Sequence, residues 1–114
     1  MARSWQAKLA AGFTVSASWG GDMQNTLYQL LTLAQQHDMV WVGLGLAPGN
    51  NHSKGSTDDL TRTGASLGVM AQANAAQGNE GIGESEFRTA PALGKRVAEA
   101  ALHRHGTAPL AQAG

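Results

Sequence analysis

The sequence predicts an α/β fold with a parallel sheet, and three observations in its first half support this prediction. Residues 13–15 form a short apolar stretch of strand length. A repeat of leucines with helical spacing follows between residues 27 and 34, and a second apolar run occupies residues 39–46. Strand, helix and strand in this order make a βαβ unit, in which a crossover helix joins two parallel strands.

Size and composition limit what the chain can be. A chain of 114 residues has the length of one modest domain. Apolar residues make up 42% of it, and eight basic residues balance eight acidic ones. A chain without net charge has no broad basic face for phosphate backbones, so we expect no nucleic-acid partner. No cysteine is present, which excludes disulfides, thiolate zinc sites and thiol nucleophiles.

Targeting signals are not evident in the sequence. No apolar run reaches the roughly 18 residues that a membrane span needs, and the opening MARSWQAKLAAG has no long apolar stretch of signal-peptide type. We therefore expect a soluble, cytoplasmic protein with no membrane partner. Residues 1–105 are expected to belong to one domain, and the Ala/Pro/Gly-rich residues 106–114 are expected to be a disordered tail.

The elements before the first loop follow from local patterns. Residues 4–10 are expected to form a short helical turn, and residues 13–15 the first strand. Asp22 is expected to cap the helix that follows, because its carboxylate can accept from the free N–H groups of a first helical turn.

The first long helix has a clear apolar face. Its residues at i, i+3, i+4 and i+7 are Leu27, Leu30, Leu31 and Ala34. We expect His37 and Asp38 to close this helix. Residues 39–46 are apolar almost throughout, as in a strand that is buried on both faces.

The second half contains a long irregular stretch. Residues 48–51 have strong turn chemistry, and residues 52–64 are polar, with a short helical turn expected at 58–60. A loop of this length in a compact domain is usually functional or disordered. Residues 65–71 are expected to add a short strand, and residues 74–83 to be mobile.

A second long helix is expected near the end of the chain. Thr89 is its predicted cap, and Pro91 would be tolerated in its first turn. Its apolar face is expected to consist of Leu93, Val97, Ala100 and Ala101.

The candidate binding residues lie in the loop after the first strand, because open α/β sheets bind ligands beyond the carboxyl ends of their strands. This loop consists of Ser16, Ala17, Ser18, Trp19, Gly20 and Gly21. Small residues let backbone N–H groups approach a ligand closely, and Trp19 can stack on a planar ring. The alternative is an ordinary strand-to-helix turn whose glycines serve only its geometry.

Other polar residues carry weaker signals. Asp58 and Asp59 are expected to serve a helix start rather than to form an acid/base pair. His103 and His105 lie two residues apart and point to different sides of a helix, so we expect a frayed helix end and no metal site. No catalytic residue is identified, since the sequence has no Ser-His-Asp set, P-loop or dinucleotide fingerprint.

Four short motifs together suggest a family. They are Ser16–Gly21, Thr26-Leu27, His37-Asp38-Met39 and Thr63-Gly64-Ala65-Ser66. Their order over residues 10–105 resembles the C-terminal half of the flavodoxin-like quinone reductases of the WrbA type. This resemblance implies part of a three-layer sandwich with a five-stranded parallel sheet in the order 2-1-3-4-5, of which the chain would supply strands four and five.

The resemblance also implies a function. The family binds flavin mononucleotide (FMN) and passes electrons from NAD(P)H to a quinone, commonly as a homo-oligomer. By resemblance, Ser16–Gly21 and His37 would contact the flavin, although His37 also suits a helix C-terminus. The segments 50–53 and 62–66 would close over the cofactor, or else form a solvated surface loop.

The family's phosphate-binding loop has no counterpart in the sequence, so we expect a truncated enzyme. The alternative is a non-catalytic flavodoxin-like fragment. Such a fragment would act only by oligomerising or by pairing with a separate N-terminal half.

Overall fold

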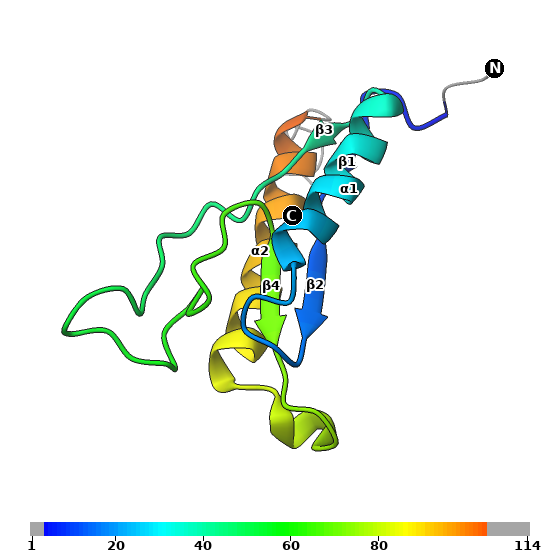
Figure 1. The fold of residues 1–114 in the computed structure, drawn as a ribbon. Helices are drawn as coiled ribbons and strands as arrows, with labels where there is room; N and C mark the ends of the chain where they lie inside the picture. Colours follow the sequence, from blue (N-terminus) through cyan, green and yellow to red (C-terminus); the bar gives the residue numbers. More distant parts are fainter. Residues whose placement is uncertain (1–3, 105–114) are drawn as a thin grey trace.

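The structure, a computed structural model, describes residues 4–104. Its elements in chain order are β1 (Leu9–Ala10), β2 (Phe13–Ser16), α1 (Met23–Gln36), β3 (Val40–Trp41), β4 (Val69–Gln72), the 3-10 helix η1 (Gly78–Gly81) and α2 (Glu84–Arg104) (Figure 1). The predicted disordered tail, residues 106–114, lies outside the described residues.

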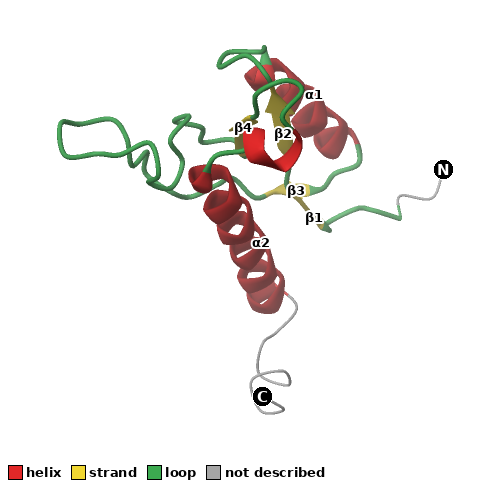
Figure 2. Cartoon of the chain, turned by 90° about the horizontal axis from the view of Figure 1, so that it is seen from below, coloured by secondary structure: helices red, strands yellow, loops and turns green. Residues whose placement is uncertain are grey.

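The strands lie between the two long helices, with α1 on one side and α2 on the other (Figure 2). All strand pairs are parallel: β1 pairs with β3, and β2 pairs with β4. Parallel strands with flanking helices confirm the predicted α/β class, and the arrangement is consistent with a flavodoxin-like fold. Within residues 4–104, neither helix is long and apolar enough to cross a membrane.

The two strand pairs form separate two-stranded sheets, but their hydrogen bonds follow one another along the chain. Carbonyls of alternate residues accept along the same edge of the β1–β2 segment. Lys8, Ala10, Gly12 and Ser16 accept from the N–H groups of Val40, Val42, Val69 and Ala73, at 2.9, 2.8, 3.2 and 2.9 Å. The segment therefore pairs first with β3 and then with β4, as if both belonged to one strand that a long loop interrupts.

Glycines allow the change of partner between β3 and β4. A Cβ on Gly68 would collide with the carbonyl oxygen of Gly12, and a Cβ on Gly12 would lie 2.9 Å from the Trp41 ring. The Trp41 indole N–H donates to the carbonyl oxygen of Leu67 over 2.9 Å, which holds β3 to the segment just before β4. Side chains at positions 12 and 68 would separate the backbones at this point.

The pairing predicted for the first strand is wrong in part. The strand expected over residues 39–46 contains only Val40–Trp41, and β2 pairs with β4 rather than with it. Residues 43–46 leave the ladder to begin the long loop, where the N–H of Leu44 donates to the carbonyl of Ser66 over 2.9 Å. Val40 is 40% exposed, so this segment is not buried on both faces.

Helix α1 matches its predicted extent and closes at His37 as expected. Met23, Leu27 and Ala34 are buried on its inner face. Asp22 is its N-cap, but the backbone of this residue is in the left-handed region, with φ 50°, and its carboxylate makes no capping hydrogen bond. The helical turn expected over residues 4–10 is also wrong, because the chain makes a turn at residues 4–7 and then enters β1.

Helix α2 begins five residues earlier than Thr89, the predicted cap. The Glu86 carboxylate instead caps the start by accepting from the N–H of Gly83 over 3.1 Å. Thr89 instead lies within the helix, where it is buried. Pro91 lies beyond the first turn. The predicted mobile segment 74–83 contains η1 and an antiparallel bridge between Ala73 and Ile82.

The long loop between β3 and β4 leaves the body of the protein and returns to it (Figure 1). Residues 59–67, here called the return limb, pack against α2 and β4. The core between these segments consists of Leu44, Ala65, Val69 and Leu93. Thr63 Oγ1 donates to the carbonyl of Met70 over 2.7 Å, so a side chain covers the outer edge of β4.

Within residues 4–104, no strand pairs with the opposite edge of the strand pairs, which is here called the open edge. Alternate peptide groups of a strand point to opposite edges, so the groups of Ala11, Phe13 and Val15 point away from β4. The side chains of Phe13 and Val15 are 76% and 61% exposed. A groove of about 460 Å³ runs between this edge and α2, lined by Ala11, Gly12, Phe13, Ala90, Leu93, Gly94 and Val97. The open edge is thus flanked by apolar surface.

Candidate functional site

The loop between β2 and α1 is at the carboxyl end of β2, where the sequence predicts a binding site. Residues 17–21 are exposed, and Ser16 is half-buried. The structure therefore brings Ser16, Ala17, Ser18, Trp19, Gly20 and Gly21 together on one accessible edge.

Two side chains hold the first half of the loop. Ser16 Oγ accepts from the N–H of Ser18 over 3.1 Å. Gln72, at the end of β4, donates through Nε2 to the carbonyl of Ala17 over 2.8 Å and to Asn74 Oδ1 over 3.0 Å. Because Gln72 is only 6% exposed, the loop is anchored to the neighbouring strand.

The second half of the loop requires a glycine. Gly21 has φ +54°, and a Cβ at this position would collide with the Ser16 side chain. Gly20 has no atom within 4 Å of such a Cβ. The two glycines therefore differ: Gly21 shapes the turn, and Gly20 leaves space above it.

Four consecutive N–H groups, three in the loop and the fourth at the N-cap of α1, are unused. Within residues 4–104, the amides of Trp19, Gly20, Gly21 and Asp22 donate no hydrogen bond. Unpaired amides in a small-residue loop are available to an acceptor on a ligand. The loop can thus bind a ring edge that carries carbonyl oxygens or develops negative charge.

Trp19 has a partner that the sequence did not predict. Its ring is 57% exposed, and the guanidinium of Arg62 lies 4.9 Å from the ring centroid. Arg62 Nε also donates to Glu86 Oε1 over 2.7 Å. Three segments far apart in the sequence meet here, and no local pattern links them.

His37 is not brought to the loop. It lies at the other end of α1, and a helix of 14 residues spans about 21 Å. Its N–H donates to the carbonyls of Leu33 and Ala34, and its ring lies 4.9 Å from the ring of Trp5. The structure thus places His37 as a helix C-cap, away from the other six predicted residues.

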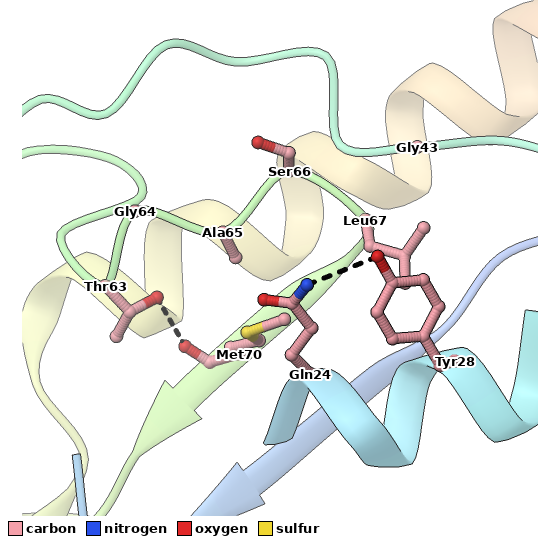
Figure 3. Close-up of a pocket in the computed structure, with 9 residues that line it drawn as sticks. All are labelled: Gln24, Tyr28, Gly43, Thr63, Gly64, Ala65, Ser66, Leu67 and Met70. Atoms are coloured by element: carbon pink, nitrogen blue, oxygen red, sulfur yellow. Dashed lines mark hydrogen bonds between the residues drawn. The ribbon is translucent and has the colours of Figure 1, made fainter. Parts of the chain in front are cut away.

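A cavity of about 400 Å³ lies between α1 and the return limb (Figure 3). Gln24 Nε2 donates to the Tyr28 hydroxyl over 3.3 Å. The lining residues are Gln24, Tyr28, Gly43, Thr63, Gly64, Ala65, Ser66, Leu67 and Met70. None of them is charged, so the cavity suits a neutral ligand with polar groups.

The remaining candidate residues lie elsewhere. Residues 50–53 are exposed in the outer part of the long loop, and His52 Nδ1 accepts from the N–H of Lys54 over 3.2 Å. In the part of the chain that the structure describes, no three His, Asp or Glu side chains are grouped as a metal site would need. His105 lies outside that part.

Parallel strands between two helices, with an open glycine loop beyond β2, define an α/β protein of flavodoxin-like arrangement. The sequence is 40% identical, over 103 residues or 90% of this chain, to the protein named Flavodoxin FldP from Pseudomonas aeruginosa (strain UCBPP-PA14). The aligned stretch is 55% of that protein, so the chain spans about half the length of this relative. No family model and no solved structure matches the chain.

Proposed function

We propose that this chain is part of an FMN-binding electron-transfer protein of the flavodoxin type. The observation that supports the proposal most is the open loop Ser16–Gly21, with unused amides at the carboxyl end of β2. The similarity to a protein named flavodoxin supports the same conclusion independently.

The residues of the loop fit a flavin. The pyrimidine edge of the ring carries carbonyl oxygens and gains negative charge on reduction, which free N–H groups stabilise. The amides of Trp19 to Asp22 would serve this edge, and the exposed Trp19 ring offers a stacking surface. His37 has no role in this version of the site, because α1 separates it from the loop.

When bound, FMN supplies the redox chemistry. The finer proposal, from the resemblance to WrbA-type enzymes, is NAD(P)H:quinone oxidoreductase activity of a longer parent protein. The balanced reaction transfers a hydride from NAD(P)H and a proton from solvent to the quinone, which becomes a hydroquinone. The chain's own contribution would be to hold the ring edge and to stack on the ring.

The uncharged cavity supports a quinone as the acceptor. Its lining offers the Tyr28 hydroxyl and the Gln24 amide to carbonyl oxygens. It contains no cation that would hold the phosphates of a nicotinamide nucleotide. In a flavin-loaded protein, replacement of Tyr28 by Ala should therefore slow quinone reduction and leave flavin affinity unchanged. Equal loss of both would contradict the assignment of the cavity.

The test of flavin binding is a fluorescence titration of the purified chain with FMN and with riboflavin. Quenching of flavin fluorescence is expected with both. Since the sequence has no match to the family's phosphate loop, the two dissociation constants should agree within about threefold, whereas several hydrogen bonds to a phosphate, each worth about 1.5–3 kcal/mol, would separate them by orders of magnitude.

A matched variant pair makes this titration specific to the loop. Gly21→Ala disturbs the turn, and Gly20→Ala does not, because only the first introduces a collision. Weaker binding by Gly21→Ala alone supports the site. Equal affinity of both variants and of the unaltered protein places the flavin elsewhere, and absence of binding by the unaltered chain contradicts the proposal for this polypeptide.

The open edge of β1–β2 favours a second candidate, a fragment that acts by oligomerising. Unpaired peptide groups and the exposed Phe13 and Val15 side chains are typical of a surface that another strand covers. In a solution of this chain alone, the strand that is available comes from a second copy. A colourless protein whose mass rises with concentration would favour this candidate over the first.

A further inference from the structure

Arg62 belongs to the return limb, and its side chain contacts both α2 and the Ser16–Gly21 loop. It is 13% exposed, and Glu86, its partner at 2.7 Å, is 5% exposed. Glu86 is itself fixed, because its second oxygen accepts from the N–H of Gly83 over 3.1 Å. The backbone N–H of Arg62 donates to Ser85 Oγ over 3.2 Å. The guanidinium is therefore held in one orientation by the start of α2.

The same guanidinium makes a cation–π contact with Trp19. It lies 4.9 Å from the centre of the indole ring, and Trp19 as a residue is more than half exposed. A planar guanidinium can lie over an aromatic face and still pair with a carboxylate in its own plane, which a lysine ammonium cannot reproduce. The contact thus joins Trp19 to a residue 43 positions later in the sequence.

We propose that Arg62 is a positioning residue, which holds the Trp19 indole as one wall of the ligand site at the Ser16–Gly21 loop. Glu86 fixes Arg62, and Arg62 fixes Trp19, so the return limb and α2 together set the shape of the site. The part of this inference that concerns flavin rests on the proposed function. The part that concerns Trp19 does not.

The test of the Trp19 contact uses the whole chain labelled with 5-fluorotryptophan and observed by fluorine NMR. Trp5, Trp19 and Trp41 each supply one resonance, and Trp19→Phe assigns the relevant one. Arg62→Met and Arg62→Lys should both move the Trp19 resonance. The Trp41 resonance should stay in place, because this half-buried indole is hydrogen-bonded to the carbonyl of Leu67 and reports an intact fold.

Arg88→Met is the matched control. Arg88 Nη1 also holds the long loop to α2, by donating to the carbonyl of Asp58 over 3.0 Å, but within residues 4–104 its guanidinium makes no cation–π contact with Trp19. The Trp19 resonance should not move in this variant. A Trp19 resonance that stays in place in both Arg62 variants, or that moves equally in Arg88→Met, would overturn the proposal. If Arg62→Met also moves the Trp41 resonance, its fold is disturbed, and the Trp19 resonance of Arg62→Lys alone decides whether the proposal holds.

Flavin binding supplies the second readout. Loss of an exposed cation–π contact should weaken FMN binding about two- to fivefold in Arg62→Met, and Arg62→Lys should not restore it. If the unaltered chain binds no FMN, the proposed function fails while the resonance shift still supports the positioning of Trp19. If the chain binds FMN and the Arg62 variants bind it equally well, the ligand-site part of the inference is overturned.

Discussion

Gly21 and Gly20 are neighbours with different structural roles. Gly21 is in the left-handed region, at φ +54°, and a Cβ there would meet the Ser16 side chain. Gly20 faces open space. The sequence indicates a small-residue turn at this place, but it does not distinguish the two glycines, because the colliding Ser16 atoms come from the strand before the turn.

This difference predicts that alanine at one position destabilises the protein and alanine at the other does not. Gly21→Ala should lower the free energy of unfolding by about 1–3 kcal/mol, since it combines backbone strain with a collision. Gly20→Ala should change it by less than about 0.5 kcal/mol, as an exposed substitution does. Urea unfolding of both variants measures the difference, and equal stabilities would show that the loop does not hold Gly21 in this conformation.

The sequence predicted the residues of the loop itself but not the distant residues that hold it. The six residues from Ser16 to Gly21 come together as expected, because they are consecutive. Arg62 lies in the segment 62–66 that was expected to close over the cofactor, but its contacts with Trp19 and Glu86 were not predicted. Neither Gln72 nor Glu86 was predicted, although Gln72 contacts the loop and Glu86 holds Arg62. Their contacts join residues 24 to 55 positions apart, and no periodic pattern encodes such pairs.

At the scale of the elements, α2 shows how tertiary contacts shift a helix boundary. The sequence favours a start at Thr89, with Pro91 in the first turn. In the structure, the helix starts at Glu84 and Thr89 Oγ1 accepts from the N–H of Thr61 over 2.9 Å. The return limb thus recruits an extra turn of helix, and this leaves Pro91 in an interior position.

An interior proline costs a helix one hydrogen bond, so its removal should stabilise α2. Pro91→Ala restores an N–H that can donate to the carbonyl of Phe87, and should raise the free energy of unfolding by about 1–3 kcal/mol. Thermal unfolding followed by circular dichroism measures this change. Ala98→Pro, an exposed site in the same helix, should lower stability by a similar amount. A less stable Pro91→Ala would mean that the helix does not continue through this residue.

The strands were predicted less well than α1. An amphipathic helix of 14 residues repeats its signal over several turns. By contrast, β1 and β3 contain two residues each, too few for any pattern. Which strand pairs with which depends on the path of the long loop, and this path is set by contacts with α2.

At the scale of the whole molecule, the two edges of the strand pairs differ. Side chains of the return limb cover the outer edge of β4, and Arg62 Nη2 donates to the carbonyl of Gln72 over 3.5 Å. The β1–β2 edge has no such cover in residues 4–104, and its side chains Phe13 and Val15 are exposed. A further strand can therefore add on one side only.

Lysines on the open edge should suppress association. The unaltered chain is expected to show a mass that rises with concentration in sedimentation equilibrium, whereas Phe13→Lys with Val15→Lys should remain monomeric, because charged side chains, lysine above all, blunt a strand edge. Leu102→Lys, at an exposed position near the end of α2, is the control and should associate like the unaltered chain. A concentration-independent monomer without substitutions would contradict pairing through this edge.

The α/β class, the extent of α1 and the position of the candidate loop could be predicted from the amino-acid sequence, because they depend on residues that are close together in the chain. That β2 pairs with β4, that α2 begins at Glu84 and that Arg62 lies over Trp19 could be seen only in the folded chain. Each of these depends on how the long loop returns to the body of the protein. Its return is set by hydrogen bonds between residues far apart in the chain, which become close only when the whole chain is folded.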